Sequence, residues 1–291
     1  MNKPILLPFV AYGLVAVNLH AQDMPLSQVL VAGEDWELAV EGIGFSDAPT
    51  ADDEGNFYFS DMKSEQGLFR VSSDGKKHPF LKGATGISGM KFGPDGNLYA
   101  CRAHFRELVR INTRTSGMTV LVKGVRPNDL VVTHKCHIYF TETLKRQVTF
   151  VNPKTGEIKA ADIGITAPNG ICLSPDQGTL AVSDFRGKHC WTLSIKSDAA
   201  LRFKQSYMTM RLKPNPDAER DILPIFKPSC RDDGMITDAY TLLCRHRTRR
   251  AVLRPDRPYQ RRHSRPDWHQ RHDQRHFRWT LPPVHVCHLF R

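Results

Sequence analysis

The sequence predicts an all-β protein, a β-propeller, from three observations: a repeat of about forty residues, a strand-like segment in each repeat, and turn residues around each segment. Four similar segments carry the repeat, at residues 55–61, 96–102, 137–142 and 178–184. Their central residues are 41, 40 and 42 positions apart and are Tyr58, Tyr99, Tyr139 and Ala181. Strand-rich repeats of this length are typical of propellers, with one four-stranded blade per repeat. A β-sandwich, the alternative, does not require such even spacing.

Turn residues divide each repeat into strands. The segments follow typical turn sequences, namely Asp53-Glu54-Gly55, Pro94-Asp95-Gly96 and Pro175-Asp176-Gln177-Gly178. A second strand then follows and ends in another turn, at residues 68–75 and 148–156. The pattern therefore predicts strand, turn and strand within each repeat.

The N-terminus has the pattern of a secretory signal. Lys3 is followed by an apolar stretch at residues 5–17 and then by the small residue Ala21. We expect cleavage after Ala21, with an uncleaved anchor as the alternative. The mature protein is then expected to be periplasmic or secreted, with no membrane attachment after cleavage.

The positive charge of the 291-residue chain is concentrated at its C-terminal end. The net charge is +11, but residues 240–291 alone contain 13 Arg, no Lys and 3 Asp. The first 239 residues are nearly neutral, with 28 Lys or Arg against 27 Asp or Glu. We therefore expect three regions: a signal peptide at 1–21, the propeller at 22–239, and an aberrant tail rich in Arg, His and Pro at 240–291.

The tail has the composition of a GC-rich gene read out of frame. It contains no Gly, whereas the rest of the chain contains 20. Read from the second base of each codon, residues 245–258 permit Ala-Thr-Ala-Leu-Gly-Val-Gln-Phe-Cys-Asp-Pro-Thr-Gly-Arg, which again has strand and turn character. We predict a single-nucleotide frameshift near Ala239. The alternative is a basic tail that binds nucleic acid, anionic lipid or, through its His residues, metal. We expect no nucleic-acid partner, because a polyanion-binding role does not suit a secreted and otherwise neutral body.

Several common sites have no motif in this chain. The sequence lacks G-x-S-x-G, H-E-x-x-H, a P-loop and a Rossmann glycine fingerprint, which argues against the usual serine hydrolases, zinc proteases and nucleotide-binding proteins. Its 7 Cys include no C-x-x-C pair, so neither a structural zinc site nor a redox motif is indicated. We expect most of them to be small buried residues, and a disulfide between some pair stays open.

Polar residues beside Gly or Pro recur at matching places in the repeats. They are Asp47, Asn128, Asn169 and Asp233. Taken singly, each is a typical turn residue. In a propeller, however, residues at the same blade position converge on the axis. Two carboxylates and two carboxamides make an all-oxygen site with a net charge of about −2, which suits a hard divalent cation such as Ca²⁺.

These motifs resemble those of the gluconolactonase and senescence-marker-protein (regucalcin) family of six-bladed propellers. The resemblance runs in frame from Trp36 to Asp238. Its most specific pieces are residues 45–61, Arg126-Pro127-Asn128-Asp129, Pro168-Asn169-Gly170 and Asp233-Gly234-Met235. It implies a six-bladed β-propeller, which in this chain is incomplete in its last blades because the tail is out of frame.

The resemblance also implies a ligand set. In that family a Glu, two Asn and an Asp hold one divalent cation, and these positions correspond here to Asp47, Asn128, Asn169 and Asp233. Ca²⁺ is the expected ion, with Zn²⁺, Mg²⁺ and Mn²⁺ as alternatives. Because Asp is one methylene shorter than Glu, it stays open whether Asp47 binds the ion directly or through water.

The activity that the resemblance implies is lactone hydrolysis by a secreted, metal-dependent carboxylic ester hydrolase. Asp233 is the expected catalytic proton acceptor, and Arg126 and Asp129 are the expected substrate-binding residues. The partner is a small-molecule lactone, and the protein is expected to be a monomer or a small homo-oligomer. Two alternatives remain, an organophosphate-hydrolysing propeller and a non-catalytic binding propeller. The frameshift leaves the activity of the chain as written in question.

Overall fold

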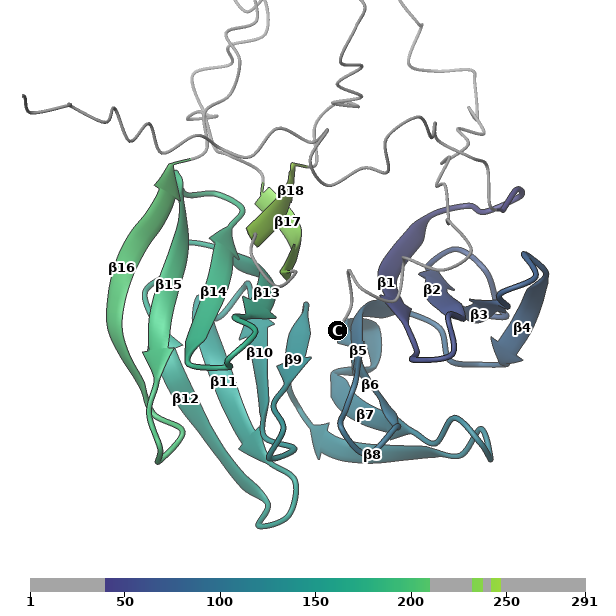
Figure 1. Ribbon diagram of the computed structural model, residues 1–291, viewed down its shortest axis with the longest axis horizontal. Coiled ribbons are helices and arrows are strands. Elements are labelled where there is room, and N and C mark those ends of the chain that lie inside the picture. The colour runs from purple at the N-terminus through teal and green to yellow at the C-terminus, as the bar shows by residue number, and fades with distance from the viewer. Residues whose placement is uncertain (1–39, 210–231, 238–241, 247–291) are drawn as a thin grey trace, which may run out of the picture.

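The computed structural model describes residues 40–209, 232–237 and 242–246 (Figure 1). The predicted signal peptide at 1–21 lies outside the described residues, and so do residues 247–291 of the predicted tail. Within the described ranges, no helix is long and apolar enough to cross a membrane.

Antiparallel sheets follow one another along the chain, as Figure 1 shows. The first contains β1 (Ser46–Ala51), β2 (Phe57–Asp61), β3 (Leu68–Val71) and β4 (Lys77–Leu81). The second contains β5 (Ile87–Phe92), β6 (Leu98–Arg102), β7 (Glu107–Ile111) and β8 (Met118–Lys123), with the short 3-10 helix η2 (Ala103–Phe105) after β6. The third contains β9 (Leu130–Val132), β10 (Ile138–Glu142), β11 (Gln147–Asn152) and β12 (Glu157–Ile163). The fourth contains β13 (Pro168–Leu173), β14 (Thr179–Asp184), β15 (His189–Ile195) and β16 (Leu201–Thr209). The fifth has two described strands, β17 (Asp232–Thr237) and β18 (Leu242–His246).

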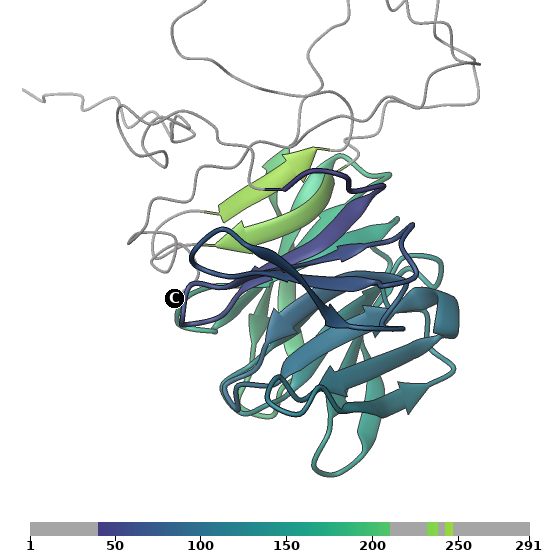
Figure 2. The same cartoon turned by 90° about the vertical axis from the view of Figure 1, so that its right-hand side faces the viewer.

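The strands of each sheet lie in chain order, so the first strand forms one edge of a four-stranded sheet and the fourth strand forms the other. The first strands β1, β5, β9, β13 and β17 pack against one another in that order, whereas β4, β8, β12 and β16 lie at the outside (Figure 1). The side view in Figure 2 shows successive sheets as separate, twisted units. Such sheets are the blades of a β-propeller, and the predicted fold is confirmed. We call them blades 1 to 5; a sixth blade stays a prediction.

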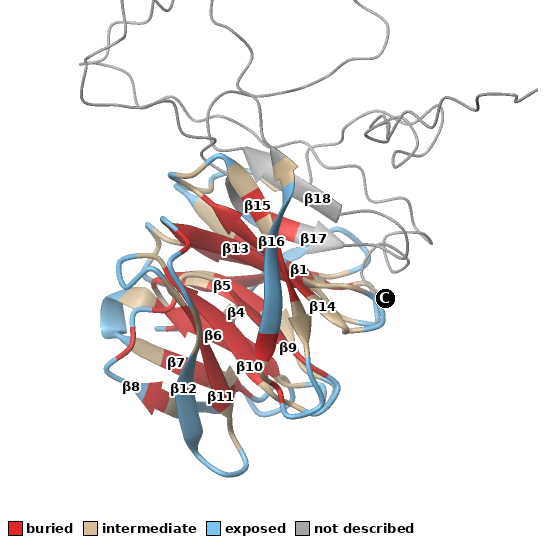
Figure 3. Ribbon diagram, turned by 90° about the vertical axis from the view of Figure 1, so that its left-hand side faces the viewer, coloured by how far each residue is buried: buried red, intermediate tan, exposed pale blue. Residues whose placement is uncertain are grey.

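The repeat segments of the sequence are the second strands of the blades, β2, β6, β10 and β14, and the strands predicted to follow them at 68–75 and 148–156 are β3 and β11. Every residue of β6 and β10 is buried, as expected for strands that pack against neighbouring blades on both faces. The outer strand β12 is mostly exposed (Figure 3). Each blade therefore buries its inner strands and presents its fourth strand to solvent.

The repeated tyrosines tie the second strands to the turns before them. The hydroxyl of Tyr58 donates a hydrogen bond to Asp52 at 3.0 Å, and that of Tyr99 donates to Asp95 at 3.0 Å. Burial and the neighbouring Asp52 carboxylate raise the pKa of Tyr58 to about 12, so the hydroxyl remains a donor. The turn and the strand are thus fixed together by residues that recur with the repeat.

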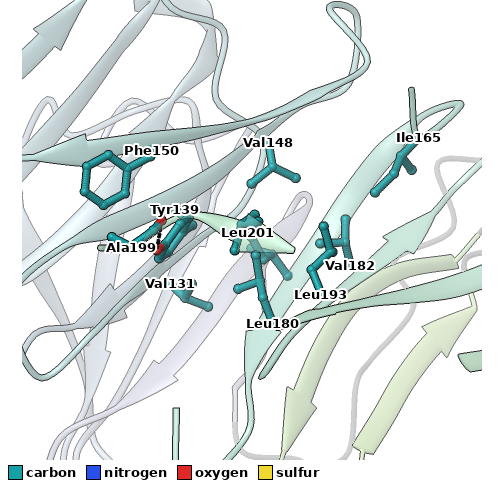
Figure 4. Close-up of a cluster of buried hydrophobic side chains, with 11 residues drawn as sticks. Val131, Tyr139, Val148, Phe150, Ile165, Leu180, Val182, Leu193, Ala199 and Leu201 are labelled. Atoms are coloured by element: carbon teal, nitrogen blue, oxygen red, sulfur yellow. Dashed lines mark hydrogen bonds between the residues drawn. The ribbon is translucent and has the colours of Figure 1, made fainter. Parts of the chain in front are cut away.

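The hydrophobic core lies between neighbouring blades. Figure 4 shows the cluster shared by blades 3 and 4, in which Phe150, Leu180 and Leu201 are buried. The Tyr139 hydroxyl crosses between these blades and donates a hydrogen bond to the Ala199 carbonyl at 2.7 Å. Similar clusters join blade 1 to blade 2 and blade 2 to blade 3. Because each blade covers a face of the next, the blades stabilise one another.

Four cysteines, Cys101, Cys136, Cys172 and Cys190, are free thiols. Cys101, Cys172 and Cys190 are buried, as the sequence predicts for most of them, and Cys136 is half-buried. Burial raises the pKa of Cys101 and of Cys172 well above the usual thiol value, so these two groups stay neutral and pack as apolar side chains.

Blade 5 continues past the point at which the propeller is predicted to end. Met235, Ile236 and Thr237 of β17 pair with Cys244, Leu243 and Leu242 of β18. β18 lies beyond residue 239, so the sheet extends into the segment assigned to the tail. The frameshift and the nature of residues 247–291 stay predictions.

Candidate metal and substrate site

The candidate ligands occupy one structural position that is repeated from blade to blade. In blades 1, 4 and 5 the inner strand pairs with the end of the next strand through Ser46 and Asp61, Pro168 and Asp184, and Asp232 and His246. The residue that follows on the inner strand is Asp47, Asn169 or Asp233. The register shifts between Asp47 and Thr50 in blade 1, between Pro168 and Ile171 in blade 4, and between Asp232 and Met235 in blade 5, so each of these residues lies at a bulge. Such bulges re-aim side chains at the rims of sheets. The predicted equivalence of these three residues is therefore present in the strand register.

Blade 3 has the same arrangement around Asn128. The N–H of Asn128 donates to the carbonyl of Thr141 at 2.8 Å, and the N–H of Thr141 donates to the carbonyl of Asp129 at 2.9 Å. Thr141 thus faces two residues of the other strand, as in a bulge. In blade 2 the register shifts at Ser88, which the sequence analysis did not single out.

Hydroxyl groups link the ligand positions of successive blades. The Ser88 hydroxyl donates to the Asn128 carbonyl at 2.7 Å, and the Thr141 hydroxyl donates to the Asn169 carbonyl at 2.5 Å. Because each bond crosses from one blade to the next, it fixes the backbone that carries an asparagine relative to its neighbour. The two asparagine positions are therefore held by tertiary contacts as well as by their own strands.

A buried carboxylate anchors the loop before each of three inner strands. Asp61 accepts hydrogen bonds from the N–H groups of Gly44 and Phe45 at 3.1 and 3.0 Å. Asp184 accepts from those of Thr166 and Ala167 at 3.0 and 2.8 Å. We call the segments before the first strands of blades 1 to 4, at residues 40–45, 82–86, 124–129 and 164–167, the lead-in loops. In blades 1 and 4 the acidic anchors thus satisfy backbone N–H groups of these loops.

In blade 3 the carboxylate of Glu142 anchors the lead-in loop, at the predicted substrate-binding residue Arg126. Its carboxylate accepts hydrogen bonds from the Arg126 N–H at 3.1 Å and from the side chains of Gln147 and Thr149, and it pairs with Lys145. Burial on its own raises the pKa of Glu142, but the bonds from Lys145, Thr149 and Arg126 outweigh burial and hold the pKa below its usual value. Glu142 therefore stays ionised and fixes the backbone of Arg126.

Blade 2 reverses the charge at this position. Arg102 stands where blades 1, 3 and 4 have an acid, and its guanidinium donates to the carbonyls of Gly83 and Thr85 at 3.4 and 3.5 Å. Arg102 also pairs with Glu107. The lead-in loop of this blade is thus held through its carbonyls instead of its N–H groups.

The structure gives the two predicted substrate-binding residues different surroundings. Arg126 is exposed on the lead-in loop of blade 3, where its side chain forms no ion pair within the described residues. Asp129 is half-buried, and its carboxylate accepts from the N–H groups of Leu130 at 2.8 Å and of Ile171 in blade 4 at 3.3 Å. Arg126 is therefore available for substrate, whereas Asp129 joins the inner strands of blades 3 and 4.

The donor chemistry at the ligand position fits a hard cation. Asn169 is only 7% exposed, yet its side-chain amide makes no hydrogen bond to any residue of the described ranges. Asp47 presents a carboxylate, one oxygen of which accepts from the Ala48 N–H at 2.9 Å. The side chain of Asp233 lies outside the described residues, although β17 carries it. Across the described residues no three His, Cys, Asp or Glu side chains gather as a metal site, so a cation here would depend on the asparagine amides.

Gly89 gives the most direct test of the packing around Asn128. A Cβ at residue 89 would lie 2.6 Å from an Asp129 carboxylate oxygen, 2.7 Å from the Asp129 Cα and 2.8 Å from the Asn128 carbonyl oxygen. We expect Gly89→Ala to lower the free energy of unfolding by about 1–3 kcal/mol, since backbone atoms must move. Urea denaturation of the frame-restored chain measures this change. Gly117→Ala is the matched control, because its nearest neighbour is a Thr115 hydroxyl at 3.2 Å; equal midpoints for both variants would contradict the expectation.

The two ends of the propeller differ in charge. Backbone bonds from Met62 to Phe45 and from Phe185 to Ala167, at 2.8 and 2.9 Å, place the lead-in loops beside the loops between second and third strands. We call this end, where the ligand positions lie, the site end. Among described loops, its basic residues are Lys63, Lys82, Arg106, Arg126, Lys145, Arg146, Arg186 and Lys188, and its acidic residues are Glu41, Glu65 and Asp129.

The loops of the opposite end carry a small excess of acidic residues. Its described loops carry Asp52, Asp53, Glu54, Asp74, Asp95, Asp176 and Asp198, against Lys76, Arg114, Lys135, Lys154 and Lys196. Among loop residues, positive charge is therefore concentrated at the site end, whereas the strand ends there carry the acids Asp47, Asp61, Glu107, Glu142, Asp162 and Asp184.

Comparison with known proteins gives a family match and structural relatives. A family model described as "SMP-30/Gluconolactonase/LRE-like region" matches residues 45–249. A gluconolactonase of Zymomonas mobilis subsp. mobilis is 26% identical over 234 residues, covering 66% of this chain and 66% of that protein, just under two thirds of its length. A gluconolactonase structure from Xanthomonas campestris has a TM-score of 0.57, 21% identity and 72% coverage of both chains. The calcium-binding protein regucalcin from Agrobacterium tumefaciens has a TM-score of 0.51 and 17% identity, covering 70% of this chain and 68% of that one. Both structural similarities support the fold.

Proposed function

The chain belongs to the SMP-30/Gluconolactonase/LRE-like family, and on that premise we propose that it hydrolyses sugar lactones with the help of one divalent cation. The observation that carries the proposal is the shared position of Asp47, Asn128, Asn169 and Asp233 at the starts of four inner strands. The curated gluconolactonase relative supports the lactone as substrate. The signal-like N-terminus supports action in the periplasm or outside the cell.

Asp47, Asn128, Asn169 and Asp233 would hold the cation, and Ca²⁺ suits a set of oxygen donors best. When bound, such an ion polarises a carbonyl oxygen and lowers the pKa of water. The two asparagine amides contribute donors without charge, so the site keeps a net charge of about −2 before the ion binds. The calcium-binding relative of known structure has the same fold.

The remaining chemistry falls to residues of the chain. In the reaction, the oxygen of water adds to the lactone carbonyl carbon, the ring C–O bond breaks, and the ring oxygen leaves as a hydroxyl group. Asp233 accepts the proton of the attacking water and returns it to the ring oxygen. Arg126, whose backbone Glu142 fixes, donates hydrogen bonds to the oxygens of the sugar ring. Asp129 keeps blades 3 and 4 in register beneath these groups.

Removal of divalent ions tests the proposal. We expect a chelator to lower kcat/KM for glucono-1,5-lactone by at least about a hundredfold, the loss typical of removing electrostatic stabilisation of an oxyanion. Added Ca²⁺ should restore the rate. The assay uses the full chain, both as written and with the reading frame restored after codon 239.

A phosphotriester panel run beside the lactone separates the alternatives. Hydrolysis of phosphotriesters alone would replace the lactonase assignment by organophosphate hydrolysis. Calcium binding without any hydrolysis would make the protein a binding propeller.

A further inference from the structure

Basic side chains lie on loops at the site end of every complete blade. Lys63 lies on the β2–β3 loop, Arg106 on the β6–β7 loop, Arg126 on the lead-in loop of blade 3, Arg146 on the β10–β11 loop and Arg186 on the β14–β15 loop. All five are exposed. We call these five residues the basic ring; clustered charges of one sign attract ligands of the opposite sign.

Backbone bonds join these loops to one another. The Val125 N–H donates to the Arg106 carbonyl at 3.2 Å, so the β6–β7 loop of blade 2 contacts the lead-in loop that carries Arg126. The Gly164 N–H donates to the Arg146 carbonyl at 3.0 Å, so the β10–β11 loop of blade 3 likewise contacts the lead-in loop of blade 4. The basic residues are thus fixed at the site end by contacts between blades.

The five basic side chains form no ion pairs. None of Lys63, Arg106, Arg126, Arg146 and Arg186 forms an ion pair within the described residues, in contrast to Lys145, which pairs with Glu142. The acids Asp61, Glu142 and Asp184 at the same end are buried and accept backbone hydrogen bonds, whereas the five basic side chains are exposed. Guanidinium groups free of partners are suited to carboxylate or phosphate.

We infer that the preferred substrate is an anionic lactone, a sugar lactone that carries a further carboxylate or phosphate outside its ring. The inference rests on the proposed lactonase function and specifies its substrate class. The lactone carbonyl would lie at the ligand position, and the additional anion would reach the surrounding guanidinium groups. Hydrolysis adds water across the ring ester bond and yields a hydroxy acid whose new carboxyl group releases one proton.

The test compares three lactones on the full chain, as written and with its frame restored. Glucaro-1,4-lactone carries a carboxylate, 6-phosphoglucono-1,5-lactone carries a phosphate, and glucono-1,5-lactone is neutral. We expect kcat/KM to be at least about tenfold higher for an anionic lactone at low salt, and the advantage to shrink at 0.3 M NaCl because exposed charges are screened. The anionic lactone with the higher kcat/KM shows whether the preferred additional group is a carboxylate or a phosphate.

Reversing the charge of two residues of the basic ring tests whether they cause the preference for anionic lactones. We expect Arg106→Glu with Arg146→Glu to lower the ratio of anionic to neutral kcat/KM at least about tenfold. The control, Arg114→Glu with Lys135→Glu, makes the same change in charge on exposed loops of the opposite end and should keep the ratio. Calorimetric titration with glucarate provides a readout that needs no turnover.

Each outcome decides between the two proposals. Equal kcat/KM for all three lactones overturns the inference and leaves the lactonase function standing. If no lactone is hydrolysed, the proposed function fails, and glucarate binding decides the inference: binding lost in the Arg106/Arg146 variant supports it, and no binding overturns it. Retention on phosphatidylglycerol vesicles that the same variant abolishes, without any preference for anionic lactones, would assign the basic ring to a lipid surface instead.

Discussion

Asp233→Ala is expected to abolish lactone hydrolysis, with a loss in kcat/KM of at least about 10²–10³-fold. The substitution removes a charged oxygen donor from the cation site and the proposed acceptor of the water proton. The strand register supports this position, since Asp233 follows the pair of Asp232 and His246 as Asn169 follows the pair of Pro168 and Asp184. Steady-state kinetics of the frame-restored chain, with Ca²⁺ present, measure the loss.

Asp232→Ala is the matched control, because it removes the same chemical group one position earlier on β17. Asp232 corresponds to Ser46 and Pro168, which the proposed site does not use. We expect this variant to keep most of the activity. Activity near that of the parent in Asp233→Ala, or equal losses in both variants, would remove Asp233 from the mechanism.

The blades could be predicted from the sequence because their most regular feature is local. The repeat of Tyr58, Tyr99 and Tyr139 at the centres of second strands reflects burial on both faces, and the Asp and Gly residues before those strands form tight turns. Gly55 and Gly96 adopt φ of 81° and 70° in these turns, as their place in the pattern requires.

The acidic anchors of the lead-in loops were missed, although their signal is present in the repeat. Asp61, Glu142 and Asp184 each end a repeat segment and each follow a hydroxyl-bearing residue. Read alone, an acid at a strand end indicates only a solvent-exposed turn. Whether such an acid is buried depends on a loop from elsewhere in the chain that folds over it. Glu142, for example, is only 1% exposed.

Contacts between blades explain what else the sequence could not specify. Ser88 belongs to the ligand position of blade 2 but has no Asn or Asp to mark it. Asp129 lies beside candidate ligands in the sequence, yet it bonds to the backbone of the next blade. The basic ring could not be predicted from a nearly neutral body, because its residues lie on loops far apart in the sequence that reach one end only when the blades fold.

Restoring the reading frame after Ala239 is expected to have the largest effect on stability. In the described part of the chain as written, blade 5 has two strands and blades 1 to 4 have four. The buried clusters between blades show that each blade covers a face of its neighbour, so an incomplete blade leaves apolar surface and a strand edge exposed. Unfolding free energies are only about 5–15 kcal/mol, and the packing of a missing blade is expected to exceed that margin.

We therefore expect the 291-residue chain to be insoluble or to unfold without cooperativity, and to lack lactonase activity. The frame-restored chain should be soluble, melt cooperatively by circular dichroism and hydrolyse a lactone. The nucleotide sequence around codon 239 provides an independent check, because one inserted or deleted base must be found there. A chain expressed from the frame as written that melts in one cooperative transition and is active would show that residues 240–291 complete the propeller in their own way. The Gly turns and alternating apolar residues of a last blade are then dispensable, contrary to the physical argument.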